Sequence, residues 1–181
     1  IGENDDFVCE LIRKDSLNDF ILYINQNNSK IKQSIYETNN LMLQRINNNP
    51  SLIEYAAFFG SIQIFKYLFL NKFESDFLLW LNAIHGKNSE IIHLLEENQE
   101  IEHRNELFKL LFIESIKCHH NEFADYIQNN YLEIEKEEKV TKYYLKNYNF
   151  NYIENEKINE TTFNYLCKYD YYTLVSILFN S

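Results

Sequence analysis

Apolar side chains recur along this chain as a four-residue stripe, in which two apolar residues, one other residue and two more apolar residues follow one another. Positions i, i+1, i+3 and i+4 share one face of a helix, so each stripe predicts a short amphipathic helix. The stripes are Phe20, Ile21, Tyr23, Ile24; Ile64, Phe65, Tyr67, Leu68; Ile91, Ile92, Leu94, Leu95; Phe123, Ala124, Tyr126, Ile127; and Leu174, Val175, Ile177, Leu178.

Two further marks accompany every stripe and divide the chain into helical hairpins. Eight positions before each stripe lies a small or apolar residue, where a first helix would contact the second: Ile12, Ala56, Ala83, Ser115 and Leu166. Near the end of each stripe lies an Asn, which takes the left-handed backbone conformation more readily than most residues and is therefore predicted to end the helix. These residues are Asn27, Asn71, Asn98, Asn130 and Asn180.

The spacing of these marks predicts a single domain over residues 1–181. Ser51 and Glu54 have the spacing of a capping box, and Thr161 occupies the position equivalent to Ser51 in the last hairpin. One or two short helices are expected in an irregular insert at 30–46, and a degenerate hairpin whose second helix carries Phe150, Tyr152 and Ile153. The predicted hairpins span approximately 6–28, 51–72, 78–99, 107–130, 140–156 (degenerate) and 161–181.

Residues 51–72, SLIEYAAFFGSIQIFKYLFLNK, resemble the helix pair of the ankyrin repeat, approximately TPLHxAAxxGHxEIVxLLLxxGA. The matching positions are Ser51, Ile53, Ala56, Ala57, Gly60, Gln63 to Phe65 and Tyr67 to Phe69. The Asn- and Tyr-rich style of the chain from Asp6 to Asn180 looks like the divergent ankyrin proteins of some parasitic protists. The TPLH tetrapeptide, the C-terminal Gly-Ala and most turn glycines of the family are missing.

The resemblance implies an all-α solenoid of five to six stacked helical hairpins, with short or degenerate β-hairpin fingers between them. It also implies that a partner protein meets the concave face. Phe58 and Phe59 predict a binding hot spot there, with burial against a neighbouring helix as the alternative. Carried over by alignment, the concave face comprises Tyr55, Phe58, Phe59, Asn82, His85, Glu114, Lys117, Tyr165, Lys168 and Tyr169.

Composition agrees with a helical protein and narrows the classes of partner. Three Gly and one Pro in 181 residues are too few for the tight turns of most β-sheet domains or phosphate-binding loops. A formal charge of -10 opposes binding to the phosphates of nucleic acids. Three distant cysteines, no apolar run long enough to span a membrane and no signal-peptide pattern indicate a cytoplasmic protein without a membrane span.

Candidate chemistry is sparse in this sequence. Cys118, His119 and His120 are adjacent, but neighbouring side chains on a helix or turn diverge and seldom bind one metal ion. Trp80 and Cys167 align with core positions and are expected to be buried. No catalytic motif is found, so the sequence predicts a scaffold or adaptor, not an enzyme, that binds another protein and needs no cofactor. The alternatives are an inert structural or assembly segment of a larger repeat protein and, less favoured, an all-α enzyme with an unrecognised site.

Overall fold

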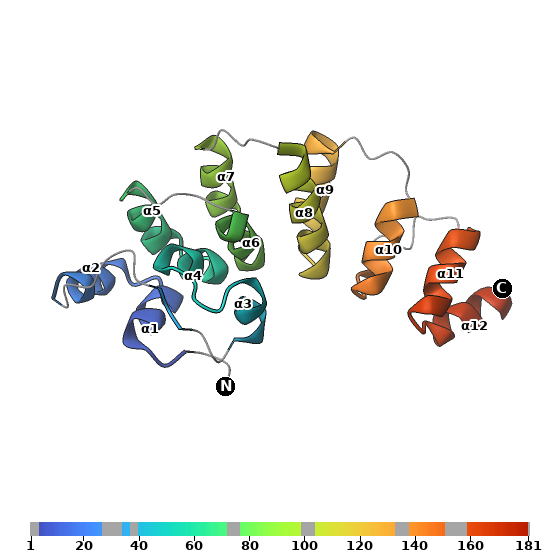
Figure 1. The fold of residues 1–181 in the computed structure, drawn as a ribbon, viewed down its shortest axis with the longest axis horizontal. Helices are drawn as coiled ribbons and strands as arrows, with labels where there is room; N and C mark the ends of the chain where they lie inside the picture. Colours follow the sequence, from blue (N-terminus) through green and yellow to red (C-terminus); the bar gives the residue numbers. More distant parts are fainter. Residues whose placement is uncertain are drawn as a thin grey trace. The chain divides into compact units, whose positions relative to one another are not determined.

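The computed structural model describes residues 4–26, 34–36, 40–71, 77–98, 104–132, 138–150 and 159–180. The described part is all-α, as the sequence predicts, and no helix in it is both long enough and apolar enough to cross a membrane. The helices are α1 Phe7–Arg13, α2 Leu17–Gln26, α3 Leu41–Ile46, α4 Leu52–Phe59, α5 Ile62–Leu70, α6 Phe77–Gly86, α7 Ser89–Glu97, α8 Arg104–Lys117, α9 Asn121–Tyr131, α10 Glu138–Lys146, α11 Glu160–Lys168 and α12 Tyr172–Asn180 (Figure 1).

The chain divides into two compact units, Ile1–Glu102 and His103–Ser181. In the first unit, α1 packs on α2, α4 on α5 and α6 on α7, so that each pair forms a helical hairpin. The first helices of these hairpins contact one another in the order α1, α4, α6, and the second helices in the order α2, α5, α7. In the second unit, α8 pairs with α9 and α11 with α12, while α10 contacts both α8 and α11.

The apolar stripes form the core of both units. Ile64, Phe65 and Leu68 of α5 are fully buried, as are the equivalent side chains of α7 and most of those of α2 and α9. Trp80 is also buried, which confirms its predicted core position. Cys167 was expected to be buried, and this prediction is wrong, because its side chain is exposed on α11.

Each first helix ends at a residue with left-handed backbone conformation, which we name the turn residue. The turn residues have φ between 50° and 68° and are Asp15, Gly60, Lys87, His119, Tyr148 and Asp170. After five of them, the next backbone N–H donates to the carbonyl five residues earlier, as from Ser61 to Ala56 at 2.9 Å and from Tyr171 to Leu166 at 3.0 Å. This is the hydrogen bond of a Schellman turn, and it satisfies a carbonyl that the helix end leaves unpaired.

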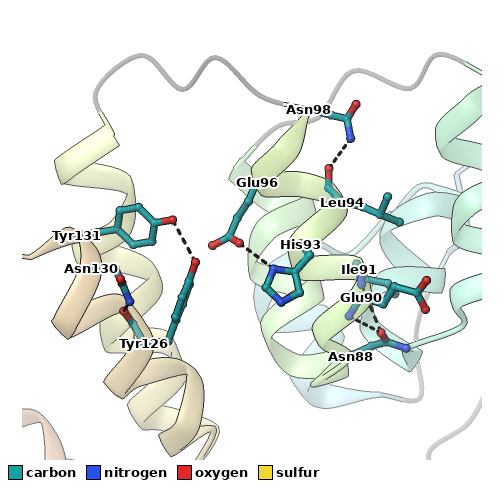
Figure 2. A network of polar contacts seen from close by, with 10 residues as sticks. All are labelled: Asn88, Glu90, Ile91, His93, Leu94, Glu96, Asn98, Tyr126, Asn130 and Tyr131. Atoms are coloured by element: carbon teal, nitrogen blue, oxygen red, sulfur yellow. Dashed lines mark hydrogen bonds and ion pairs between the residues drawn. The ribbon is translucent and has the colours of Figure 1, made fainter.

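The prediction that Asn ends the second helices in a left-handed conformation is wrong at Asn71 and Asn98, whose φ angles are -84° and -105°. Each side-chain amide instead donates to the carbonyl four residues earlier, at 2.7 Å from Asn71 and 2.8 Å from Asn98 (Figure 2). Asn130 makes the same bond at 2.8 Å. Because the side chain itself satisfies the last carbonyls, no left-handed residue is required there. Asn27 and the side chain of Asn180 lie outside the described residues.

The two predicted helix starts have different outcomes. Ser51 and Glu54 form the expected capping box, with Ser51 N–H donating to Glu54 Oε2 at 2.6 Å and Glu54 N–H donating to Ser51 Oγ at 3.4 Å. Thr161 is not the cap of α11, because Asn159 occupies that position and its Oδ1 accepts from the N–H of Thr162 at 2.8 Å. The last hairpin therefore begins two residues earlier than the alignment with Ser51 indicates.

Hydrogen bonds between successive hairpins follow a repeated rule. The side chain of the residue after the turn residue donates to the carbonyl that lies three residues before the preceding turn residue. Ser61 Oγ donates to Ile12 O at 2.5 Å, Asn149 Nδ2 donates to Ile116 O at 3.1 Å, and Tyr171 Oη donates to Leu145 O. Between α4 and α6 the acceptor differs, since Asn88 Nδ2 donates to Gly60 O at 3.0 Å.

The first two hairpins exchange a second pair of bonds. The carboxylate of Asp15 accepts from the backbone N–H groups of Gln63 and Ile64, at 3.0 Å each. These groups belong to the first turn of α5, whose own N-cap residue, Ser61, makes no capping bond. The side chain of one hairpin therefore caps a helix of the next, a role that a local Ser, Thr, Asp or Asn usually performs.

The insert and the expected fingers are described only in part. Within the predicted insert at 30–46 lies α3, and an isolated antiparallel bridge joins Ser34 to Ser51, where Ile35 N–H donates to Pro50 O at 2.7 Å. The segments in which fingers were expected, 27–33, 72–76 and 99–103, lie outside the described residues. So does 151–158, which contains Tyr152 and Ile153 of the degenerate hairpin.

Candidate protein-binding face

The predicted contact residues all lie on first helices, five, two or one residues before the turn residue. Tyr55, Phe58 and Phe59 on α4 and Asn82 and His85 on α6 belong to the first unit. The second unit holds Glu114, Lys117, Tyr165, Lys168 and Tyr169, on or directly after α8 and α11. Each unit therefore carries its own part of the candidate face.

Tyr55 and Asn82 are fully buried, with 0% of either residue exposed, so neither side chain offers surface to a partner. Their position, five residues before the turn residue, is enclosed because α4 lies between α1 and α6, and α6 contacts α3 as well as α4. The hydroxyl of Tyr55 accepts from Arg13 Nη1 at 2.9 Å, which ties α4 to α1. Asn82 Nδ2 donates to Leu78 O at 2.7 Å, whereas its buried Oδ1 has no hydrogen-bond partner.

Phe58, Phe59 and His85 are half-buried and form an aromatic cluster that bridges α4 and α6. The rings of Phe58 and His85 stack with centroids 5.6 Å apart, and those of Phe58 and Phe59 meet edge to face at 5.2 Å. Phe59 also contacts the buried ring of Tyr55 at 4.7 Å. The cluster thus rests on the core below it and keeps part of its apolar surface exposed. Each of the two alternatives for Phe58 and Phe59, exposure and burial, describes part of each side chain.

A glycine makes this cluster possible. Gly86 lies at the end of α6, and a Cβ added to it would lie 2.0 Å from the carbonyl oxygen of Ala57. No side chain fits in that space, so the close approach of α4 and α6 requires glycine. This contact holds the ends of the two helices together where Phe58 meets His85. Gly86 is not the turn residue of its hairpin, because Lys87 has the left-handed conformation.

The second unit presents charged and tyrosine side chains at the equivalent positions. Lys117 Nζ lies 2.6 Å from Glu114 Oε2, and the rings of Tyr165 and Tyr169 stack with centroids 6.2 Å apart. Lys117 and Lys168 are exposed. The ion pair is partly solvated and one helical turn long, so it orients the Lys117 ammonium group but adds little stability.

The turn residues identify two positions that the sequence alignment missed. Arg13 and Lys146 lie two residues before Asp15 and Tyr148, as Phe58, His85, Lys117 and Lys168 lie before their own turn residues. The signal that would have found them is a basic residue in the last turn of the first helix, which also stabilises the negative end of the helix dipole. It was overlooked because the alignment relied on Asn at the ends of second helices.

The adjacent Cys118, His119 and His120 turn to different partners. Cys118 Sγ contacts Ser115 O at 3.6 Å, His119 Nε2 lies 3.2 Å from Asn147 O, and the ring of His120 stacks on Phe123. Among the described residues, no group of three or more Cys, His, Asp and Glu side chains is placed to hold a metal ion.

Two ionisable side chains with shifted pKa values lie off the candidate face. A hydrogen bond from Lys14 at 2.5 Å lowers the pKa of Glu10. Burial, with a smaller contribution from Tyr148, raises the pKa of Tyr171, which contributes the hydrogen bond to Leu145. Both shifts thus have a structural cause in a neighbouring residue.

Comparison with models of protein families, with curated proteins and with solved structures finds no match to this chain. The resemblance to ankyrin repeats accordingly rests on the chain's own residues.

Proposed function

We propose that the helical hairpins are divergent ankyrin-type repeats, and that their first helices form the concave face of a scaffold that binds another protein without catalysis. Three observations support this proposal. First helices contact first helices and second helices contact second helices in the first unit. A left-handed turn residue follows α1, α4, α6, α8, α10 and α11. The sequence at 51–72 matches the ankyrin helix pair, including Gly60 at its turn.

The observation that carries the binding role is the aromatic cluster of Phe58, Phe59 and His85. Its rings are packed against one another and against Tyr55, so they lose little conformational freedom when a partner covers them. Apolar aromatic surface of this kind supplies the anchor residues of protein interfaces more often than exposed charged groups do. The exposed Lys117 and Lys168 belong to the second unit, where they would orient a partner more than hold it.

Binding is tested by replacing Phe58 and His85 together with alanine. We expect partners captured from a cell lysate by the wild-type protein to be lost at least about tenfold with the double variant, since a hot-spot residue contributes about 2 kcal/mol or more. The measurement is quantitative mass spectrometry of the captured proteins. The circular dichroism spectrum and thermal midpoint of the double variant establish that it is folded.

Matched controls are Leu22→Ala and Leu70→Ala, which remove exposed leucines from α2 and α5, away from the first helices. Their captured proteins are expected to equal those of the wild type. Capture that is equal for the wild type, the controls and the double variant would contradict a binding role for the cluster.

A further inference from the structure

The joint between α1/α2 and α4/α5 uses two polar side chains. Asp15, the turn residue of the first hairpin, accepts from two N–H groups of α5, and Ser61, the residue after the next turn residue, donates to Ile12 O. Ile12 lies three residues before Asp15 and is fully buried. One hairpin of the joint therefore supplies an Asp and a carbonyl, and the other supplies a Ser and the start of its second helix.

The hairpin α11/α12 offers the first half of such a joint. Its turn residue is again an Asp, Asp170, and it is exposed. Cys167 lies three residues before it and is exposed, whereas Ile12, Ala57, Ile116 and Leu145, in the same position of hairpins that are followed by another within their unit, are all 0% exposed. Leu174 and Val175 of α12 are only half-buried, although the equivalent Ile64 and Phe65 are fully buried.

The hairpin α1/α2 offers the second half. Ser16 follows its turn residue, as Ser61 follows Gly60, and is half-exposed. Phe7, eight residues before the turn residue, is 54% exposed. The equivalent residues of hairpins that follow another within their unit are Leu52, Leu79 and Thr162, which are at most 3% exposed.

We infer that these two faces bind each other, so that α11/α12 of one molecule docks α1/α2 of a second copy of this chain. Asp170 accepts from the backbone N–H groups of Asn18 and Asp19 in the second copy, at the positions that Gln63 and Ile64 occupy relative to Asp15. Ser16 Oγ, which donates to Asp19 Oδ2 at 2.7 Å in the single chain, donates instead to the Cys167 carbonyl. Phe7 of the second copy is covered in the joint.

This association is head to tail, so it leaves one free face of each kind and extends into open chains rather than closing as a symmetric dimer. Each copy carries a formal charge of -10, and the resulting repulsion weakens with salt. We therefore expect association to increase between low and moderate salt. The inference rests on the equivalence of the hairpins and is independent of the aromatic cluster, so loss of partner binding in the Phe58 and His85 variant leaves it unaffected.

The test is sedimentation velocity of the full chain over a range of protein concentrations at moderate salt. We expect the wild type to form dimers and longer species, and both Phe7→Glu and Cys167→Glu to be monomeric alone, since each blocks one exposed face. A mixture of the two variants retains one intact face of each kind and is expected to form a 1:1 heterodimer and nothing larger. A wild type that stays monomeric, or oligomers that persist in either variant, would overturn the inference.

The polar contact is tested separately with Asp170→Ala. We expect the dissociation constant of the joint to rise about 5- to 30-fold, the effect of losing a helix cap. Glu122→Ala, which removes an equal charge from an exposed position of α9, is the matched control and is expected to leave association unchanged. Equal effects of the two substitutions would show that charge alone acts, and would overturn the assigned contact.

Discussion

Replacing Gly86 with alanine is expected to lower the free energy of unfolding of the first unit by about 3 kcal/mol or more, because the added methyl group would lie 2.0 Å from Ala57 O. That oxygen belongs to the backbone, so the overlap is relieved only by moving α6 away from α4. Helix propensity alone predicts the opposite sign, a gain of about 1 kcal/mol for Gly to Ala within a helix. The two explanations are therefore cleanly separated.

Denaturant unfolding followed by tryptophan fluorescence measures this effect, because Trp80 is the single tryptophan and is buried in α6. The neighbouring Lys87→Gly is the matched control. Lys87 has a φ of 52°, which costs a residue with a side chain more than it costs glycine, so this variant is expected to be unchanged or stabilised by up to about 1 kcal/mol. An unfolding free energy of Gly86→Ala equal to or above that of the wild type would contradict the close approach of α4 and α6.

Tyr55→Ala is expected to lower the free energy of unfolding by about 3 to 5 kcal/mol, as for other large buried aromatic side chains. Its ring is fully buried, and its removal leaves a cavity below Phe59 and deprives Arg13 of an acceptor. Tyr55→Phe retains the ring and is expected to cost about 1 kcal/mol, the contribution of one hydrogen bond. The same fluorescence-detected unfolding measures both variants.

Phe58→Ala provides the comparison that separates core from contact surface. Phe58 is half-buried, so we expect it to lose less than half the stability that Tyr55→Ala loses, while weakening partner binding. If Tyr55→Ala proved as stable as the wild type and yet abolished partner binding, Tyr55 would be a contact residue, and its burial against α1 would be contradicted.

The sequence predicted the helices, the core stripes, the position of Trp80 and the Ser51 capping box because these depend on local periodicity and short-range spacing. An apolar stripe such as Ile64, Phe65 and Leu68 identifies its buried face without knowledge of the neighbouring helix. The same local information placed Phe58 and His85 near the surface. It could not reveal that their rings stack, since that depends on how closely α4 approaches α6.

The turns could not be predicted in the same way. Of the turn residues, only Gly60 is a glycine, while Lys87, His119 and Tyr148 are residue types that rarely take positive φ. Their conformation is set by the Schellman bonds and by contacts with the next hairpin, not by their own preference. The cap that Asp15 provides to Gln63 and Ile64 joins residues far apart in the sequence, so no local pattern marks it.

The burial of Tyr55 and Asn82 had a similar cause. Alignment to the ankyrin helix pair assigned both to the partner-facing side because that position is usually exposed in the family. In this chain, Gly86 lets α6 approach α4 closely, and both side chains lie in the enclosed part of the first unit. A single glycine outside the turn position thus changed the surface that the alignment predicted.

The central claim, that successive hairpins are joined by one recurring turn geometry, is tested most directly by NMR spectroscopy of the full chain. The account predicts backbone couplings diagnostic of positive φ at Asp15, Lys87, His119 and Asp170. It also predicts nuclear Overhauser contacts from the β-protons of Asp15 to the amide protons of Gln63 and Ile64. Negative φ at these turn residues, with no contact between Asp15 and α5, would contradict it.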